Sequence, residues 1–242
     1  MGSEMCIRDR VYIDYKSPYA FVAMAPTLQL EFQFDVEIDW FPLTLNLGSY
    51  LGTARTNNSG QVIENNRSPR QWMAVRYAYY DTRRYARQLG LTLRGTHKIW
   101  DSSIAAIGLL WCKATSKPEV VRAYHRIVFH PFWRRELDIE DLSIVEGCLV
   151  RAGAPKSGFA DYLNGEGRSS HDQLQDDILD RGYFGVPTFV IDDEIYFGRE
   201  HLPLIRWHLA GQKGACPDIA YDTVMPQQGF GREFLAGAET VS

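Results

Sequence analysis

The sequence predicts an α/β protein in which a β-α-β unit and a later β-hairpin are separated by a long helical segment. Three observations support this. Apolar residues alternate with polar ones near residue 11 and again from residue 36, two apolar runs meet at an acidic turn within 184–198, and residues 69–180 carry helical periodicity. A chain of 242 residues that is 45% hydrophobic can bury a substantial core, as one large domain or as a domain with an insertion.

The first strand is predicted over residues 11–15, which are rich in β-branched and aromatic side chains. Ser17 then occupies the position of a helix N-cap, and Pro18 the first helical position, where its fixed φ is favourable. A hydroxyl at a helix start lies beside unpaired backbone N–H groups and the positive end of the helix dipole. Ser17 is therefore a candidate for holding an anion or a thiolate, with plain capping as the alternative.

A second strand is predicted where Val36, Ile38 and Trp40 alternate with acidic residues, parallel to the first through a helical crossover. From Gly48 to Pro69 the chain is rich in Gly, Ser, Thr and Asn, so a long irregular segment is expected.

The segment 69–180 is predicted to be helical, and one face of its first helix carries Trp72, Val75, Tyr79 and Arg83. Further helical patterns cover residues 104–111, 118–132 and 140–152. Two basic clusters, Arg83-Arg84 with Arg87 and Arg134-Arg135, could attract an acidic substrate, but solvated helix faces explain them equally simply and are favoured.

A β-hairpin is predicted over 184–198, followed by a helix from Leu202 to Leu209. Pro187 opens its first apolar run. A cis bond there would expose the backbone of Val186 to a ligand, whereas an edge-strand proline is the alternative.

Two motifs carry a resemblance to a known family: Asp14-x-x-Ser17-Pro18-Tyr19 and, far along the chain, Phe184-Gly185-Val186-Pro187-Thr188. Together they resemble the thioredoxin-fold family of 2-hydroxychromene-2-carboxylate isomerases and kappa-class glutathione transferases, relatives of the DsbA-type disulfide oxidoreductases. The resemblance covers most of residues 11–210. It implies a thioredoxin-like fold with a helical domain inserted between the β-α-β half and the β-hairpin half.

The expected organisation follows from this resemblance. Residues 1–10 do not fit the pattern and are expected to be a non-native leader. The remaining parts are a thioredoxin-like first half over 11–68, a helical insertion over 69–180, a thioredoxin-like second half over 181–212 and a C-terminal tail over 213–242.

The resemblance implies a glutathione-dependent isomerase of the 2-hydroxychromene-2-carboxylate isomerase type, acting on an aromatic carboxylate through a thiolate held by Ser17. The implied glutathione-binding residues are Val186, Pro187, Arg199, Glu200 and either Asn57 or Asn58. The expected walls of the substrate pocket are Lys16, Tyr19, Trp40 and Trp72, with Tyr79 as a further candidate, although each aromatic residue could equally be core.

Two alternatives stay open: a kappa-like glutathione S-transferase and a redox-inactive DsbA-like binding protein. In favour of the second, Gly198-Arg199-Glu200-His201 departs from the family's common pattern of Gly, a small or amide residue, Asp and Arg. A dithiol oxidoreductase is excluded at this site, because Ser17 and Ala20 stand where the redox relatives carry two cysteines, and exchange needs both thiols.

Composition and charge also limit the classes of binding partner that the protein is expected to have. The net charge of −4 and pI near 5.9 disfavour nucleic acid, and no apolar run approaches the ~20 residues of a membrane span. The cysteine spacing matches neither a disulfide framework nor a zinc site, so no metal is predicted. We therefore expect a cytoplasmic protein, forming a homodimer, whose partner is a small aromatic or electrophilic substrate.

Overall fold

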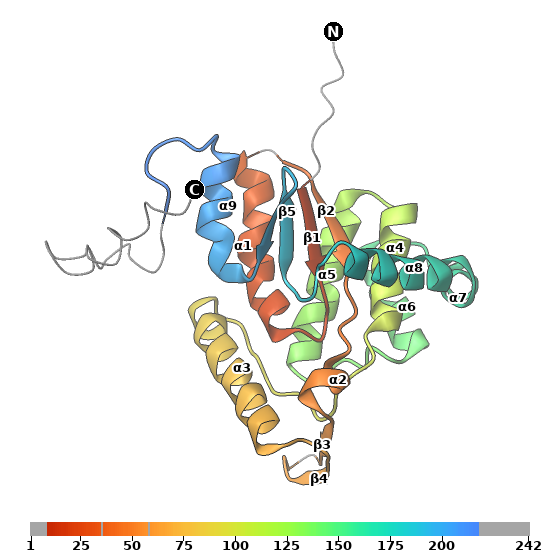
Figure 1. The fold of residues 1–242 in the computed structure, drawn as a ribbon. Coiled ribbons are helices and arrows are strands. Elements are labelled where there is room, and N and C mark those ends of the chain that lie inside the picture. The colour runs from red at the N-terminus through yellow and green to blue at the C-terminus, as the bar shows by residue number, and fades with distance from the viewer. Residues whose placement is uncertain (1–8, 35, 58, 218–242) are drawn as a thin grey trace, which may run out of the picture. The chain divides into compact units, whose positions relative to one another are not determined.

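The computed structural model describes residues 9–34, 36–57 and 59–217, and the chain divides into two units, 1–199 and 200–242. The elements of the first unit, shown in Figure 1, are β1 (Asp9–Ile13), α1 (Pro18–Phe34), β2 (Ile38–Pro42), α2 (Leu47–Leu51), β3 (Ala54–Thr56), β4 (Val62–Asn65), α3 (Pro69–Gln88), α4 (Ser103–Thr115), α5 (Pro118–Trp133), α6 (Leu142–Ala152), α7 (Phe159–Asn164), α8 (Glu166–Asp180), β5 (Thr188–Ile191) and β6 (Glu194–Phe197). A 3-10 helix (Arg199–His201) leads to α9 (Leu202–Leu209) in the second unit. No helix among the described residues is long and apolar enough to cross a membrane.

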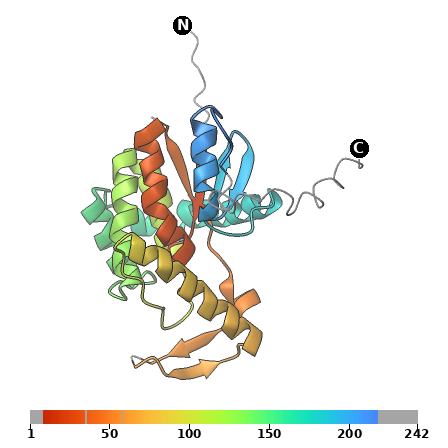
Figure 2. The ribbon, with the colours of Figure 1, turned by 90° about the vertical axis from the view of Figure 1, so that its left-hand side faces the viewer.

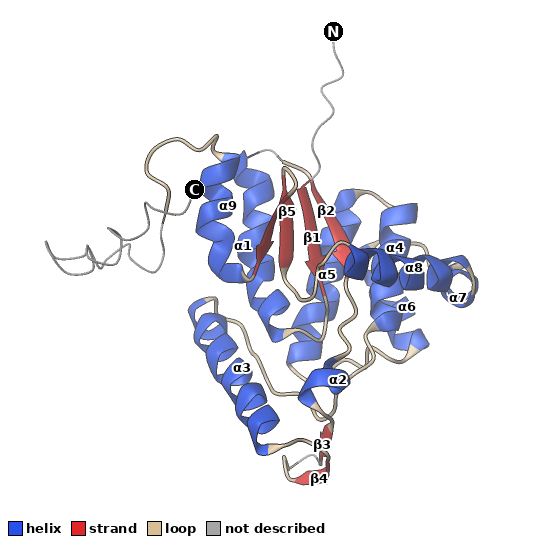
Figure 3. Ribbon diagram, viewed as in Figure 1, coloured by secondary structure: helices blue, strands red, loops and turns tan. Residues whose placement is uncertain are grey.

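A four-stranded sheet in the order β2-β1-β5-β6 is the centre of the first unit, drawn as red arrows in Figure 3. β1 and β2 are parallel, with α1 as the crossover, and β5 and β6 form the antiparallel hairpin. Val11 in β1 pairs with Trp40 on one side and with Phe189 on the other. The predicted α/β class, with a parallel β-α-β unit and a later hairpin, is confirmed.

β1 begins and ends two residues earlier than the predicted 11–15. Asp9 and Arg10, which the sequence assigned to the leader, pair with Ile38 and Asp39 of β2. The strand ends at Ile13 because the chain then turns.

The segment between Gly48 and Pro69 is more regular than predicted. It contains α2 and the β3–β4 hairpin, whose β4 residues are all exposed. The side chain of Asn57 closes the hairpin turn, since its Oδ1 accepts from the Gln61 N–H at 2.9 Å and from the Ser59 hydroxyl at 2.7 Å. These local hydrogen bonds order a stretch whose composition is typical of a loop.

The helical segment 69–180 divides into two groups. α3 begins at a capping box formed by Ser68 and Gln71, packs against α1 and α2, and buries only Thr82 and Ala86. α4 to α8 pack on one another, and α4 also packs on β2. Figures 1 and 2 show α3 near the lower end of α1, together with β3 and β4.

An aromatic cluster joins the β1–α1 turn to α5. Tyr15 lies 4.8 Å from Phe129 between ring centroids, and its hydroxyl lies 3.1 Å from Nδ1 of the fully buried His125. Burial, with a smaller contribution from the charge of Lys113, lowers the pKa of His125 to about 3. His125 is therefore neutral in the folded protein at ordinary pH.

The buried His125 predicts a pH dependence of stability. Its pKa is depressed in the folded state, so the unfolded chain binds more protons below about pH 6.5, and the free energy of unfolding falls as the pH drops toward 3. Between pH 8 and pH 5, the protonation of this residue in the unfolded chain should by itself lower the free energy of unfolding by about 2 kcal/mol. Urea unfolding followed by circular dichroism should show that His125→Phe loses correspondingly less stability over this range. An equal loss in both proteins would contradict the assignment.

Candidate active site

A pocket of about 850 Å³ lies at one end of the sheet in the first unit. Its walls come from the β1–α1 turn, the segment from Leu45 to Thr56, α3, the loop before α4, residues 184–186 and Phe197. Its volume falls within the roughly 300–1,000 Å³ of small-molecule sites. Segments from both ends of the sequence thus build one site.

Ser17 lies on the pocket wall and caps α1. Its Oγ accepts a hydrogen bond from the Ala20 N–H at 3.2 Å, and its carbonyl accepts from the Phe21 N–H at 3.1 Å. The predicted N-cap is therefore confirmed. The cap uses the hydroxyl only as an acceptor, so its O–H remains able to donate to a group in the pocket.

The neighbouring residue Lys16 carries a buried positive charge. Its ammonium lies 3.4 Å from Oδ2 of Asp14, and the two side chains are only 5% and 1% exposed. The ammonium also donates to the Ser102 hydroxyl at 3.2 Å, while Asp14 accepts from the backbone N–H groups of Lys16 and Leu45 at 3.1 and 2.8 Å. This network fixes the ammonium of the residue that precedes Ser17, and both residues line the pocket.

Val186 lies on the same pocket, and the Val186–Pro187 bond is cis. Among the described residues, neither the backbone N–H nor the carbonyl of Val186 has a hydrogen-bond partner. By contrast, the Pro187 carbonyl accepts from Gly198 at 3.0 Å, and Pro187 does not line the pocket. Of these two residues, Val186 therefore presents the open backbone edge.

One face of α3 forms a pocket wall, and it is the face on which the sequence placed Trp72, Val75, Tyr79 and Arg83. The indole N–H of Trp72 donates to Oδ1 of Asn65 at 2.9 Å, which fixes the ring. Tyr19 also lines the pocket, as predicted.

Trp40 does not line the pocket, contrary to expectation. It is 3% exposed in β2, and its ring lies 4.7 Å from that of His125 between centroids. The reason is the strand's alternation, which turns this side chain into the core. Asn57 is likewise absent from the lining, because its side chain is engaged in the β3–β4 turn. Asn58 lies outside the described residues.

Arg199 and Glu200 do not line the pocket either. The Arg199 guanidinium lies 3.4 Å from the centre of the Tyr85 ring of α3, a cation–π contact. Glu200 is exposed and belongs to the second unit.

Several lining residues were not predicted. Arg76 and Tyr80 follow Trp72 at intervals of four on α3, so the helical period could have identified them. Arg67, Lys98 and Trp100 precede or follow helices in segments without periodicity, and no sequence signal places them at the site.

The lining is of one charge sign. It includes Lys16, Arg67, Arg76, Arg83 and Lys98, and none of the lining residues described is Asp or Glu. Lys16 and Lys98 pair with Asp14 and Glu140 outside the lining, but within the described part of the chain no carboxylate pairs with the three arginines. Burial lowers the pKa of Arg67, because desolvation disfavours its charge.

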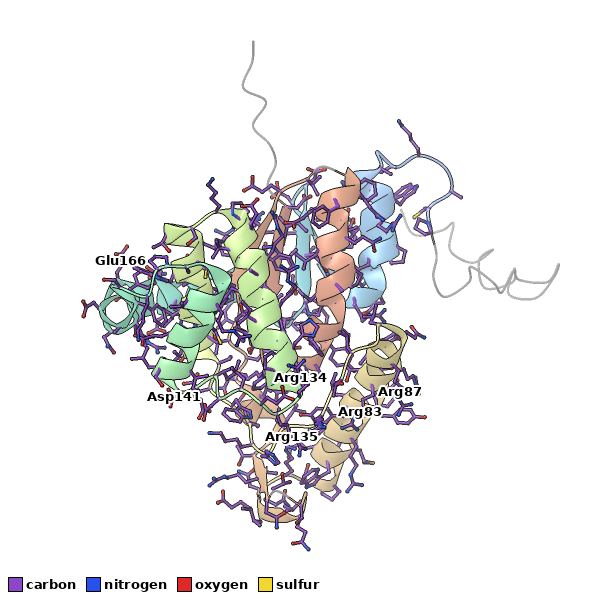
Figure 4. The ribbon with its side chains drawn as sticks, turned by 180° about the vertical axis from the view of Figure 1, so that it is seen from behind. Arg83, Arg87, Arg134, Arg135, Asp141 and Glu166 are labelled. Atoms are coloured by element: carbon purple, nitrogen blue, oxygen red, sulfur yellow. The ribbon has the colours of Figure 1, made fainter. Side chains whose placement is uncertain are left out.

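Three of the other members of the two basic clusters have local partners. Arg84 pairs with Asp81, Arg134 pairs with Glu136, and Arg135 donates to the Gly95 carbonyl. Figure 4 shows Arg83 and Arg87 on α3, and Arg134 and Arg135 at the end of α5. Only Arg83 of these residues reaches the pocket.

The buried ion pair of Asp14 with Lys16 is predicted to be important for stability. Asp14→Asn leaves the Lys16 ammonium buried without its counterion and should lower the free energy of unfolding by about 3–5 kcal/mol. The exposed pair of Arg10 with Asp193 is a matched control, and Asp193→Asn should cost less than about 1 kcal/mol. Adding Lys16→Met to Asp14→Asn should recover part of the loss in urea unfolding. A cost for Asp14→Asn no larger than that of the control would contradict the assignment.

Residues 10–210 match the family described as "DSBA-like thioredoxin domain". The chain is 23% identical over 203 residues to a 2-hydroxychromene-2-carboxylate isomerase of Sphingobium xenophagum, covering 82% of this chain and 95% of that protein. A solved 2-hydroxychromene-2-carboxylate isomerase superposes with a TM-score of 0.65 at 18% identity, covering 85% of this chain and 96% of the other. The cytosolic disulfide reductase DsbM from Pseudomonas aeruginosa, solved with GSH, gives a TM-score of 0.54 at 13% identity, covering 85% and 98%. The DsbA-like thioredoxin fold predicted from the two motifs is confirmed.

Proposed function

The chain belongs to the family of DSBA-like thioredoxin domains, and from this premise we propose that it is a glutathione-dependent isomerase of the 2-hydroxychromene-2-carboxylate isomerase type, acting on an aromatic carboxylate. The observation that carries the proposal is the meeting of Ser17, at a helix start, with the open backbone of Val186 on one pocket. Relatives named as this isomerase match most of the chain and support it.

The residues present fit glutathione. Val186 offers an N–H and a carbonyl that, among the described residues, have no partner, and a peptide backbone can pair with such an edge as an added strand. Ser17 lies on the same pocket, so a ligand held at Val186 has a hydroxyl within the same enclosure. Glutathione, when bound, supplies a thiol that can act as a nucleophile in its thiolate form.

Ser17 favours the charged form of a bound thiol. Its O–H can donate to a thiolate while its oxygen continues to accept from the Ala20 N–H. The start of α1 adds the positive end of a helix dipole at the same place. Both effects favour thiolate over thiol and so lower the thiol pKa.

Lys16 adds a fixed positive charge beside this position. It is held by Asp14 and Ser102, so its ammonium keeps its place whether or not a ligand is present. A preorganised charge stabilises an anion without having to reorient first.

The lining suits an aromatic acid as the substrate. Tyr19, Trp72, Tyr79 and Trp100 offer apolar faces, and the cationic side chains favour a carboxylate over a neutral ligand. Dithiol exchange is not part of the proposal, because Ser17 and Ala20 occupy the helix start, and none of the described lining residues is a cysteine.

The first test separates capping from thiolate binding. Ser17→Ala should lower the free energy of unfolding by about 1 kcal/mol through loss of the cap, and should lower turnover about 100-fold through loss of the donor. Glutathione affinity should fall, whereas affinity for S-methylglutathione, which has no thiolate, should not. Asp141→Ala is the matched control: it removes the N-cap of α6, a residue that does not line the pocket, and should reduce stability but not turnover. Asp141 is labelled in Figure 4. Equal turnover in Ser17→Ala and the parent protein would contradict the proposal.

A second test asks whether glutathione binds and is returned. A ligand that binds only the folded form at 100 times its Kd raises the free energy of unfolding by about 2.7 kcal/mol, so the Tm should rise with glutathione concentration. With 2-hydroxychromene-2-carboxylate as substrate, the glutathione concentration should stay constant over many turnovers. Stoichiometric consumption of glutathione would indicate a kappa-like transferase instead. No rise in Tm would favour a redox-inactive binding protein.

A further inference from the structure

The arginines of the pocket present unbalanced positive charge. Arg67 and Arg76 both approach the Trp72 ring, with their Cζ atoms 5.0 and 5.8 Å from its centroid. Among the described residues neither has a carboxylate partner, and the pocket lining contains no acidic side chain. Two like charges gathered at one indole repel each other, and an anion between them would relieve this repulsion.

Arg67 is also held in place for such a role. Its Nε donates to the Gly52 carbonyl at 3.3 Å, which orients the guanidinium and leaves its terminal NH₂ groups as donors. Trp72 is in turn fixed by Asn65, whose Oδ1 also accepts from the backbone N–H of Arg67 at 3.0 Å. The guanidinium, the indole and the loop that connects them therefore form one ordered unit.

The other cations of the lining are less suited to this role. Lys16 and Lys98 have carboxylate partners, and the Arg83 Nε donates to the Leu93 carbonyl at 3.2 Å while its guanidinium lies over Tyr79. Arg76 is exposed and lines the pocket on the same side of α3 as Trp72. The excess charge is thus concentrated where α3 begins.

We propose that Arg67 and Arg76, gathered at Trp72, form the carboxylate-binding site that selects aromatic acids as ligands of this pocket. Two charge-assisted hydrogen bonds to one carboxylate fix its position. The aromatic ring of the ligand then packs against Tyr19, Tyr79 and Trp100. The inference rests on the proposed function for the identity of the pocket as the substrate site. Its test requires neither glutathione nor turnover, so it can fail or succeed separately.

The test measures binding of 1-naphthoate and of the neutral 1-naphthamide by calorimetry. The parent protein should bind 1-naphthoate at least tenfold more tightly, because hydrogen bonds between charged groups are the stronger ones. Arg76→Gln and Arg67→Gln should each weaken 1-naphthoate about tenfold or more and leave 1-naphthamide unchanged. Raised salt should reduce the preference for the acid.

Arg70→Gln is the matched control, because Arg70 lies in the first turn of α3, is exposed and does not line the pocket. It should change neither affinity. If Arg67→Gln disturbs the loop through Gly52, Arg76→Gln still decides the question, since Arg76 is an exposed helical residue.

Three outcomes would overturn the inference. The parent protein could bind 1-naphthoate no better than 1-naphthamide, or Arg76→Gln could retain the full preference for the acid. The same arginines could instead serve a glutathione carboxylate, in which case both variants would lose affinity for glutathione and not for 1-naphthoate. Loss of 1-naphthoate affinity alone supports the proposal.

Discussion

The buried carboxylate of Asp14 is the contact on which the arrangement of the pocket depends. It accepts hydrogen bonds from the backbone N–H groups of Lys16 and Leu45 and forms an ion pair with the Lys16 ammonium. The ammonium in turn donates a hydrogen bond to the Ser102 hydroxyl. These contacts join the β1–α1 turn, the loop after β2 and the start of α4. A buried charge is tolerated only when it is fully partnered, so the three segments have little freedom in how they meet. Ser17 follows Lys16 directly in the chain, so the contacts that fix Lys16 also restrict the position of Ser17.

The pocket separates two tasks. The β1–α1 turn offers a hydroxyl, a helix start and an ammonium held in place by Asp14, which together suit a thiolate. The α3 side offers aromatic rings and arginines without carboxylate partners among the described residues, which suit an aromatic anion. Because the two sets come from different elements, the nucleophile and the substrate of the proposed reaction would lie against different walls. Such an arrangement lowers the entropy cost of bringing two reactants together.

The serine at the helix start changes the chemistry of the fold while keeping its electrostatics. Unpaired N–H groups and the helix dipole favour an anion whichever side chain stands there. A pair of cysteines would use this to exchange electrons, but a hydroxyl cannot be oxidised to a disulfide and can only donate or accept a hydrogen bond. The free cysteines Cys112 and Cys148 are buried in the helices, and burial raises the pKa of both thiols, so they are poor nucleophiles.

The sequence by itself determined the β-α-β unit, the hairpin, the helical segment and the cap at Ser17, because these depend on alternation, period and capping between neighbours in the chain. It also identified the α3 face of Trp72, Val75, Tyr79 and Arg83. Only the tertiary structure decided that this face and Ser17 belong to one pocket, that Trp40 points into the core, and that Arg67 joins Arg76 at Trp72. Alternation along β2 and the period of α3 fix which side chains share a face, but which face packs on the core and which meets the pocket depends on contacts between segments that are distant in the sequence.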